Sequence, residues 1–286
     1  MPFDAMNTLP TVRENYGIAI VANDKVLHWL LPFLESYRAT NAGIPLHLIP
    51  FDDNVAATRR AAELYGAIWV EDDTGEVDAL ARRLYPLFPH HRRRLRKLQA
   101  LALPLDRVIY LDVDTILFRS FEEIFHALCP GETEFVIASS SKDYVYNRNR
   151  SRHAFLEGAT LFNDGFFLTS RRTLSLADFE RVIAVDEALF HSVRKRGMLF
   201  AQPLVNFVVH RLGLKVKALA DCVPHASNES FYKAEGVTLT ANGPLDWEGR
   251  EIYFAHWAGA TGAPRRRVFD AIWRDYERRA SERMRA

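Results

Sequence analysis

Residues 107–118, "RVIYLDVDTILF", place two aspartates, Asp112 and Asp114, inside an otherwise apolar run. Side chains of a strand alternate between its faces, so both carboxylates should project on the same side, about 7 Å apart. Two like charges this close raise each other's pKa unless a cation lies beside them. Mg²⁺ or Mn²⁺ is the natural candidate, because both ions prefer oxygen ligands and are often shared with phosphate groups. The alternative is a solvated strand end with two surface acids, but the flanking apolar residues favour a metal site.

The composition is that of a globular protein. Of the 286 residues, 48% are apolar and 26% are charged, and the net charge of +1 argues against a nucleic-acid-binding protein. The two cysteines, Cys129 and Cys222, suggest neither a disulfide framework nor a cysteine-rich metal site. The first 15 residues lack a signal-peptide pattern, and no apolar run approaches the roughly 20 residues that span a bilayer. We therefore expect a soluble, cytoplasmic protein with no nucleic-acid partner.

Strand and helix signals alternate along the chain. β-branched and apolar runs predict strands at 16–22, 44–53, 67–73, 107–118, 134–140, 158–170 and 251–257. Apolar periodicity predicts helices at 26–41, 55–66 and 90–103. The opening β-α-β-α-β series predicts an α/β domain with a parallel sheet covered by helices. No linker divides the chain, so we expect one domain over residues 1–286. Ligands of such sheets bind at the carboxyl ends of the strands, where the two aspartates should lie.

Three stretches together resemble the GT-A nucleotide-sugar glycosyltransferases, particularly family 8, which includes glycogenin and bacterial galactosyltransferases. Residues 103–125, "LPLDRVIYLDVDTILFRSFEEIF", are similar to the D-x-D region of that family. Residues 161–171, "LFNDGFFLTSR", resemble its F-N-[AS]-G segment, and residues 252–259, "IYFAHWAG", resemble its terminal H-[FY]-x-G strand. The three stretches occur in the order of the family. The resemblance implies a mixed, mainly parallel sheet flanked by helices, and a metal-dependent sugar transferase.

In this family the histidine of the terminal strand joins the two aspartates at the metal, so the resemblance implies Asp112, Asp114 and His256 as ligands of Mn²⁺ or Mg²⁺. Taken alone, a strand histidine is more often simply packed or hydrogen-bonded. A divalent ion bound to the diphosphate stabilises the negative charge that develops on it as its bond to the sugar breaks. The resemblance also implies a UDP-sugar donor and retention of anomeric configuration. The acceptor could be a glycan, a lipid-linked sugar or a small molecule.

The resemblance places the nucleobase at the end of the first predicted strand, at Ala22, Asn23 and Asp24. A polar loop that caps the next helix is the alternative for these residues. Lys97 resembles a basic residue that meets the donor in the family. The alternative for its surroundings is a solvated basic face, and we expect a mostly solvated run with Lys97 or Arg96 turned inward.

The resemblance places Asn163 and Asp164 beside the donor sugar, as catalytic residues, with Gly165 allowing close approach of the backbone. The alternative for this N-D-G sequence is a turn or a β-bulge. Val113, between the two aspartates, and Gly259, after the histidine, also belong to the donor site that the resemblance implies.

One family segment is altered. Family members carry D-Q-D-x-L-N where this chain has "AQPLVN" at 201–206. Gln202 and Asn206 remain, but Ala201 and Pro203 replace both acids. Gln202 is expected to orient the donor sugar rather than to attack it, and the loss of the acids leaves the donor sugar open.

A second departure follows His256. The family's H-x-x-G-x-x-K-P-W has lysine where this chain has Gly262. Arg265 or Arg266 is expected to supply the missing positive charge to the diphosphate, because guanidinium groups suit phosphate oxygens. The polar, basic stretch 141–157 is a candidate acceptor loop, with a plain surface loop as the equal alternative.

The C-terminal residues 265–286 predict a basic amphipathic helix. They hold eight arginines against four acids, and five apolar residues at helical spacing: Val268, Phe269, Ile272, Trp273 and Tyr276. Docking of this apolar stripe on the domain is the favoured interpretation. Peripheral contact with an anionic membrane, at its inner face, is the alternative.

Two other functions compete with the transferase. D-x-D-x-T is similar to the nucleophile motif of haloacid-dehalogenase phosphatases, but those have D-x-D-G-T on their first strand. A catalytically degenerate sugar-nucleotide-binding protein is the stronger rival, because of the altered "AQP" sequence. Within a transferase, residues 16–118 would form the nucleotide-binding half, 119–264 the half for donor sugar and acceptor, and 265–286 the terminal helix.

Overall fold

In the computed structural model, residues 15–71, 75–86, 92–140, 156–186, 201–260 and 267–285 are described. A seven-stranded sheet with the order β3-β2-β1-β4-β7-β6-β8 forms its centre. Its strands are β1 (Tyr16–Ala22), β2 (Leu46–Pro50), β3 (Ile68–Trp69), β4 (Arg107–Leu111), β6 (Phe135–Ile137), β7 (Phe166–Ser170) and β8 (Val216–Ala218). The first four of these strands are mutually parallel, whereas β7 pairs antiparallel with both β4 and β6. The predicted mixed, mainly parallel sheet is therefore confirmed.

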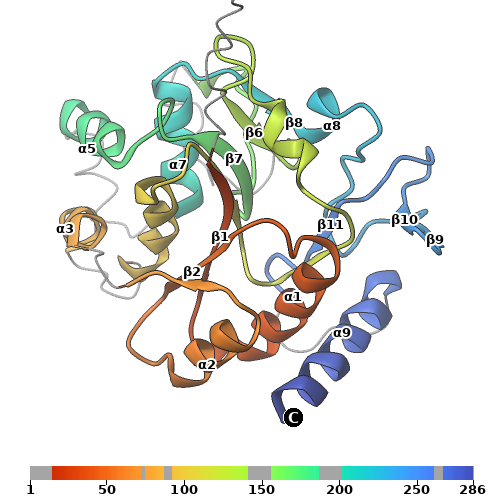
Figure 1. Cartoon of the computed structure of the whole chain (residues 1–286). Coiled ribbons are helices and arrows are strands. Elements are labelled where there is room, and N and C mark those ends of the chain that lie inside the picture. The colour runs from red at the N-terminus through yellow and green to blue at the C-terminus, as the bar shows by residue number, and fades with distance from the viewer. Residues whose placement is uncertain are drawn as a thin grey trace, which may run out of the picture.

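Helices cover both faces of the sheet (Figure 1). The α-helices are α1 (Leu27–Thr40), α2 (Ala56–Leu64), α3 (Gly75–Leu84), α5 (Leu176–Val185), α7 (Ala201–Arg211), α8 (Leu219–Cys222) and α9 (Val268–Arg285). Within the described ranges, the 3₁₀ helices are η1 (Asp24–Val26), η2 (Arg93–Ala102) and η3 (Glu123–Ala127). Alternating side chains of β1 enter two separate cores: Ile18 and Ile20 pack with α1, α2 and α9, while Ala19 packs with α3, η2, α5 and α7. The sheet is thus buried on both faces, as its apolar strands predict.

Several predicted elements are shorter or different in the structure. The strand expected at 67–73 is reduced to β3, and the strand expected at 158–170 begins only at Phe166, after a turn at 164–165. The helix expected at 90–103 is the 3₁₀ helix η2. The prediction for 251–257 holds for β11 (Phe254–His256). Strand limits depend on where hydrogen-bonding partners end, which a sequence run does not reveal.

The predicted strand 107–118 is interrupted at the aspartates. β4 ends at Leu111, and β5 (Thr115–Leu117) leaves the main sheet to pair antiparallel with β11. The chain therefore turns at 112–114, and the expectation that both carboxylates project from one continuous strand is wrong. The turn matters for the site, because it carries the chain from the carboxyl end of the central strand β4 to β5 in a second sheet. A third, two-stranded sheet consists of β9 (Thr238–Thr240) and β10 (Gly243–Leu245).

The predicted C-terminal helix forms as α9 and packs along α1 (Figure 1). Its residues Phe269 and Trp273 are fully buried, and the ring of Trp273 meets Trp29 of α1 edge-on at 5.5 Å. The docking interpretation is confirmed, and it removes most of the apolar stripe that membrane contact would use. Among the described residues, no helix has the length and apolar character needed to cross a membrane.

Glu35 is a buried link between α1 and α9. Its carboxylate accepts hydrogen bonds from Arg38, from the Tyr65 hydroxyl at 2.8 Å and from Arg283 at 3.2 Å. Burial alone would raise the pKa of Glu35, but these donors hold it below the ordinary value of 4.5. The ionised carboxylate therefore stabilises the folded chain.

Replacing Glu35 with glutamine should lower the free energy of unfolding at pH 7 by about 2 kcal/mol, the loss of charge-assisted hydrogen bonds. Because the native pKa is depressed, this stabilisation is complete above the unfolded-state pKa and disappears as the pH falls through the native pKa. Urea unfolding at pH 7 and near pH 3.5 measures both values. A wild-type advantage that is unchanged at the lower pH would contradict the assignment.

Candidate metal and nucleotide site

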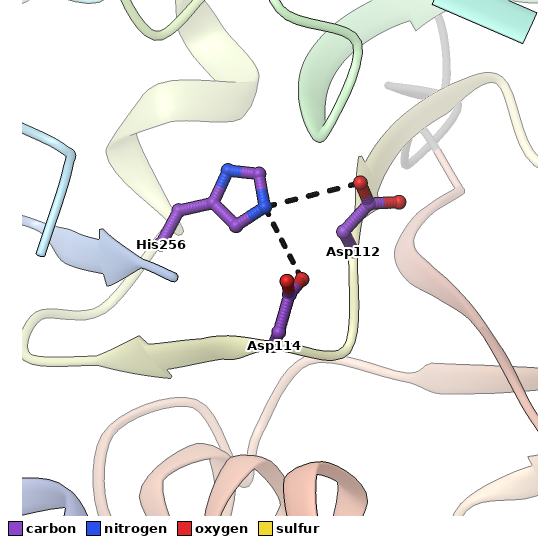
Figure 2. A group of neighbouring side chains, drawn as sticks. All are labelled: Asp112, Asp114 and His256. Carbon is purple, nitrogen blue, oxygen red and sulfur yellow. Dashed lines mark ion pairs between the residues drawn. The ribbon is translucent and has the colours of Figure 1, made fainter. Parts of the chain in front are cut away.

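The turn at 112–114 brings two carboxylates beside an imidazole (Figure 2). His256 Nε2 lies 3.2 Å from Asp114 Oδ1 and 3.9 Å from Asp112 Oδ2, and one ligand atom from each residue lies within 4.8 Å of the other two. His256 arrives on β11, whose pairing with β5 sets it opposite Thr115. Backbone hydrogen bonds fix the junction, because Asp112 N donates to Gly165 O and Trp257 N donates to Asp114 O, both at 2.8 Å.

Gly165 lies directly against this cluster. A Cβ built at this residue would fall impossibly close to the His256 ring and 2.9 Å from Asp112 Oδ2. The backbone nitrogen of Gly165 donates to Asn163 Oδ1 at 2.8 Å, which holds the turn in place. The absence of a side chain therefore leaves the space between the ligands clear. Two carboxylates and one imidazole, with free space between them, fit Mn²⁺ or Mg²⁺.

The second oxygen of Asp112 is held away from the cluster. Asp112 Oδ1 accepts a hydrogen bond from the Tyr110 hydroxyl at 2.8 Å and one from Lys97 Nζ at 3.3 Å. Lys97 also donates to the backbone oxygen of Asp164 at 3.3 Å and lies 2.9 Å from Asp164 Oδ2. These contacts orient Asp112 so that Oδ2 faces His256, which is how outer groups commonly position metal ligands.

The charges of the cluster shift one another's pKa values. Burial would lower the pKa of His256, but Asp114 and Asp112 raise it above its usual value. Burial would raise the pKa of Asp114, but His256 lowers it. Burial raises the pKa of Asp164, against the opposing charge of Lys97. The two carboxylates thus favour the protonated form of His256 when no cation lies between them.

A cavity of about 650 Å³ opens above the cluster. Its lining includes predicted residues from several segments: Ala22 and Asn23 near the end of β1, Lys97 on η2, the turn Asp112–Val113–Asp114, Asp164, and Gln202 on α7. Asn163 is not among the lining residues, but it donates a hydrogen bond to Gln202 Oε1 at 2.8 Å. The structure therefore gathers around one cavity residues that are far apart in the sequence.

The carboxylate of Asp24, which was expected near the nucleobase, contacts α2. Its carboxylate accepts hydrogen bonds from the backbone of Ala57 and from the backbone and hydroxyl of Thr58, at 2.8 to 3.2 Å. It therefore caps the first turn of α2 and is absent from the cavity lining. Burial would raise the pKa of Asp24, but these donors lower it. The capping alternative thus describes Asp24, and Asn23 likewise accepts from the Lys25 backbone while donating to Asp52.

Both candidates for the inward-facing basic residue are buried. Lys97 faces the acids, whereas Arg96 donates to Pro50 O at 2.9 Å and pairs with Asp78 at 3.2 Å. Arg93 and Arg94 are exposed, as expected for a mostly solvated run, and they also line the cavity. Because a 3₁₀ helix turns in three residues, side chains of this run reach several directions that an α-helical pattern does not indicate.

The remaining predicted residues lie elsewhere. Gly259 occupies a left-handed turn with φ of 70° and does not line the cavity. Arg265, Arg266 and Gly262 lie outside the described residues, as does most of the candidate acceptor loop 141–157. Their predicted roles stay predictions.

Some aromatic residues that line the cavity were not predicted from the sequence. Trp29 on α1, Phe51 after β2 and Tyr110 on β4 all border the cavity. For Tyr110 a signal existed, because it lies two residues before Asp112 in the predicted strand 107–118, in which the two side chains would share a face. Trp29 and Phe51 carry no such signal, since apolar residues in these elements are expected in a core.

By sequence, the chain matches no protein-family model and no curated protein. By structure, it is similar to the galactosyltransferase LgtC in complex with donor and acceptor sugar analogues, at 15% identity and a TM-score of 0.57, over 93% of this chain and 95% of that one. The chain has the GT-A glycosyltransferase fold.

Two further glycosyltransferase structures resemble it more loosely. The apo form of the bifunctional glycosyltransferase WbbM matches 97% of this chain and 53% of its own, at 11% identity and a TM-score of 0.54. The apo glycosyltransferase GlyE of Streptococcus pneumoniae matches 92% of this chain and 60% of its own, at 11% identity and a TM-score of 0.51. At these identities the similarity establishes the fold, and the resemblance inferred from three sequence stretches is confirmed at that level.

Proposed function

We propose that the chain is a metal-dependent glycosyltransferase that moves a sugar from a nucleoside diphosphate donor, UDP-linked, to a glycan, lipid-linked or small-molecule acceptor. The observation that carries this proposal is the Asp112–Asp114–His256 cluster beneath a cavity in a GT-A fold. Similarity of fold alone would leave the function open, because one fold serves many functions. The cluster adds the chemistry that such a reaction needs.

The three residues of the cluster would hold Mn²⁺ or Mg²⁺. When bound, such an ion supplies positive charge that stabilises the departing diphosphate. The protein contributes two further features. Lys97 and Tyr110 keep Asp112 oriented, and Arg93 and Arg94 bring positive charge to the wall of the cavity. Arginine side chains suit phosphate oxygens because of their planar arrangement of donors.

The donor sugar would lie between the metal cluster and the start of α7. Asn163 fixes the carbonyl end of the Gln202 side chain, so Gln202 can orient the sugar without reacting with it. The structure of LgtC has also been determined as an active-site mutant in which a glutamine is changed to glutamate. Retention of configuration is part of the proposal, and it rests on the resemblance to family 8. Ala22 and Asn23 would border the nucleobase.

A catalytically degenerate sugar-nucleotide-binding protein is the second candidate. Ala201 and Pro203 line the cavity on either side of Gln202 and offer no carboxylate there. Such a protein would bind the donor in a metal-dependent manner but would not release UDP from it.

Calorimetric titration of UDP tests the proposal, with Mn²⁺ or with excess chelator, on wild type and Asp114→Ala. We expect wild type to bind UDP only with the metal, and the variant to bind at least tenfold more weakly because one of three ligands is lost. Screening UDP-sugars for release of UDP then separates a transferase from the degenerate protein. If wild type binds UDP equally with and without metal, or not at all, the proposal fails.

A further inference from the structure

Asp164 is a third carboxylate at the cavity, and it does not belong to the metal cluster. Its side chain is only 7% exposed, yet it lines the cavity. Among the described residues that line the cavity, the carboxylates are those of Asp112, Asp114 and Asp164. The first two would be occupied by the metal, which leaves Asp164 as the negatively charged acceptor facing the bound donor.

Asp164 has one close side-chain partner within the described part of the chain. Lys97 Nζ forms an ion pair with Oδ2 at 2.9 Å, and Oδ2 has no other partner there. A carboxylate has two oxygens and can accept several hydrogen bonds, so one ammonium group leaves part of this capacity unused. A buried carboxylate with spare acceptor capacity is expected where a ligand supplies further donors.

The position of Asp164 relative to the metal cluster indicates which part of a ligand it meets. One ammonium group, that of Lys97, contacts both Asp112 Oδ1 and Asp164 Oδ2, so the two carboxylates are close neighbours. A diphosphate held at Asp112 and Asp114 has the donor sugar as its next group. The sugar bears hydroxyl groups, which can supply further hydrogen-bond donors to Asp164.

The start of α7 adds no second charged acceptor for these hydroxyls. Ala201 and Pro203 have side chains without hydrogen-bonding groups, and the Gln202 amide between them is neutral. Asn163 points its amide nitrogen at Gln202 and its oxygen at the backbone of Gly165. Among the described residues that line the cavity, Asp164 is therefore the carboxylate that remains to accept hydrogen bonds from the sugar.

We propose that Asp164 accepts a hydrogen bond from a hydroxyl group of the donor sugar and so selects donors that carry a hydroxyl at that ring position. This inference rests on the proposed function of the site. The simpler role for Asp164 is to balance the charge of buried Lys97. The two roles differ in what they predict for UDP, which has no sugar beyond the diphosphate, and for UDP-hexoses.

The experiment compares UDP with UDP-glucose and UDP-galactose, each titrated in Mn²⁺ into wild type and Asp164→Asn. The measured quantity is the ratio of the UDP-hexose Kd to the UDP Kd. We expect the variant to raise this ratio about tenfold for the hexose that wild type binds best, because a charged acceptor becomes a neutral one. Retained binding of UDP shows that the variant is folded. Glu71→Gln removes an equal charge from an exposed position and should leave both constants unchanged.

A series of monodeoxy UDP-hexoses identifies the hydroxyl. For wild type, the Kd of one monodeoxy UDP-hexose should be about tenfold higher than that of its parent UDP-hexose. For Asp164→Asn, removal of the same hydroxyl should cause no further loss of affinity, because the contact is already absent. If the variant changes the binding of UDP and UDP-hexose by the same factor, Asp164 only balances Lys97 and the inference is overturned. If wild type binds no UDP at all, the proposed function fails and the inference fails with it.

Discussion

Replacing Gly165 with alanine is expected to weaken Mn²⁺-dependent binding of UDP at least a hundredfold. The added methyl group would occupy the space between the His256 ring and Asp112 Oδ2, which it would approach to 2.9 Å. Neither neighbour can yield easily. His256 is buried on β11, and the other oxygen of Asp112 is held by Tyr110 and Lys97. Two of the three metal ligands would move, so the loss should exceed that of Asp114→Ala.

Gly43→Ala is the matched control for this variant. Gly43 has no heavy atom within 4 Å of the position where its Cβ would lie, and its backbone does not adopt a left-handed conformation. The same methyl group should therefore leave binding unchanged there. Calorimetry with UDP and Mn²⁺ gives the binding constants, and thermal unfolding shows whether each variant is folded. Wild-type affinity in Gly165→Ala would mean that the cluster does not hold the metal.

Replacing Trp273 with alanine is expected to cost about 3–5 kcal/mol of unfolding free energy, as for other large aromatic side chains in a core. Trp273 is 1% exposed, and its ring packs edge-on against Trp29. Trp29 in turn lies 6.2 Å, between ring centroids, from Trp257. Urea unfolding measures the loss. Because Trp257 directly follows His256 and its Nε1 donates to Asp270 of α9, weaker Mn²⁺-dependent binding should accompany it.

Two comparisons isolate the cause of this loss. Trp273→Phe keeps an aromatic ring in the core, and Trp273 Nε1 makes no hydrogen bond within the described residues, so this change should cost clearly less than alanine. Val268→Ala, on the same helix but 41% exposed, should cost less than about 1 kcal/mol. Equal losses for Val268→Ala and Trp273→Ala would contradict the inference that the buried Trp273 ring stabilises α9 by docking, because alanine favours the helix at both positions.

The fold class could be predicted from the sequence because the signals for it are local. Apolar strand runs such as 16–22 alternate with amphipathic helices, and this pattern admits few arrangements other than a covered, mainly parallel sheet. The stripe of Phe269 and Trp273 likewise indicated a docked helix. The residues Asp112 and Asp114 could be selected as candidate metal ligands because charge inside an apolar run requires a compensating partner.

Tertiary structure alone decided how these residues meet. The aspartates converge with His256 because the chain changes sheets at 112–114 and β5 pairs with β11, a contact that no local pattern encodes. The same holds for Asp24, whose carboxylate has donors in α2 rather than in the cavity. Gly165 is required by atoms of Asp112 and His256, which lie far from it in sequence. Periodicity and charge determine which surfaces a chain must bury, whereas the pairing of distant segments determines which side chains share a site.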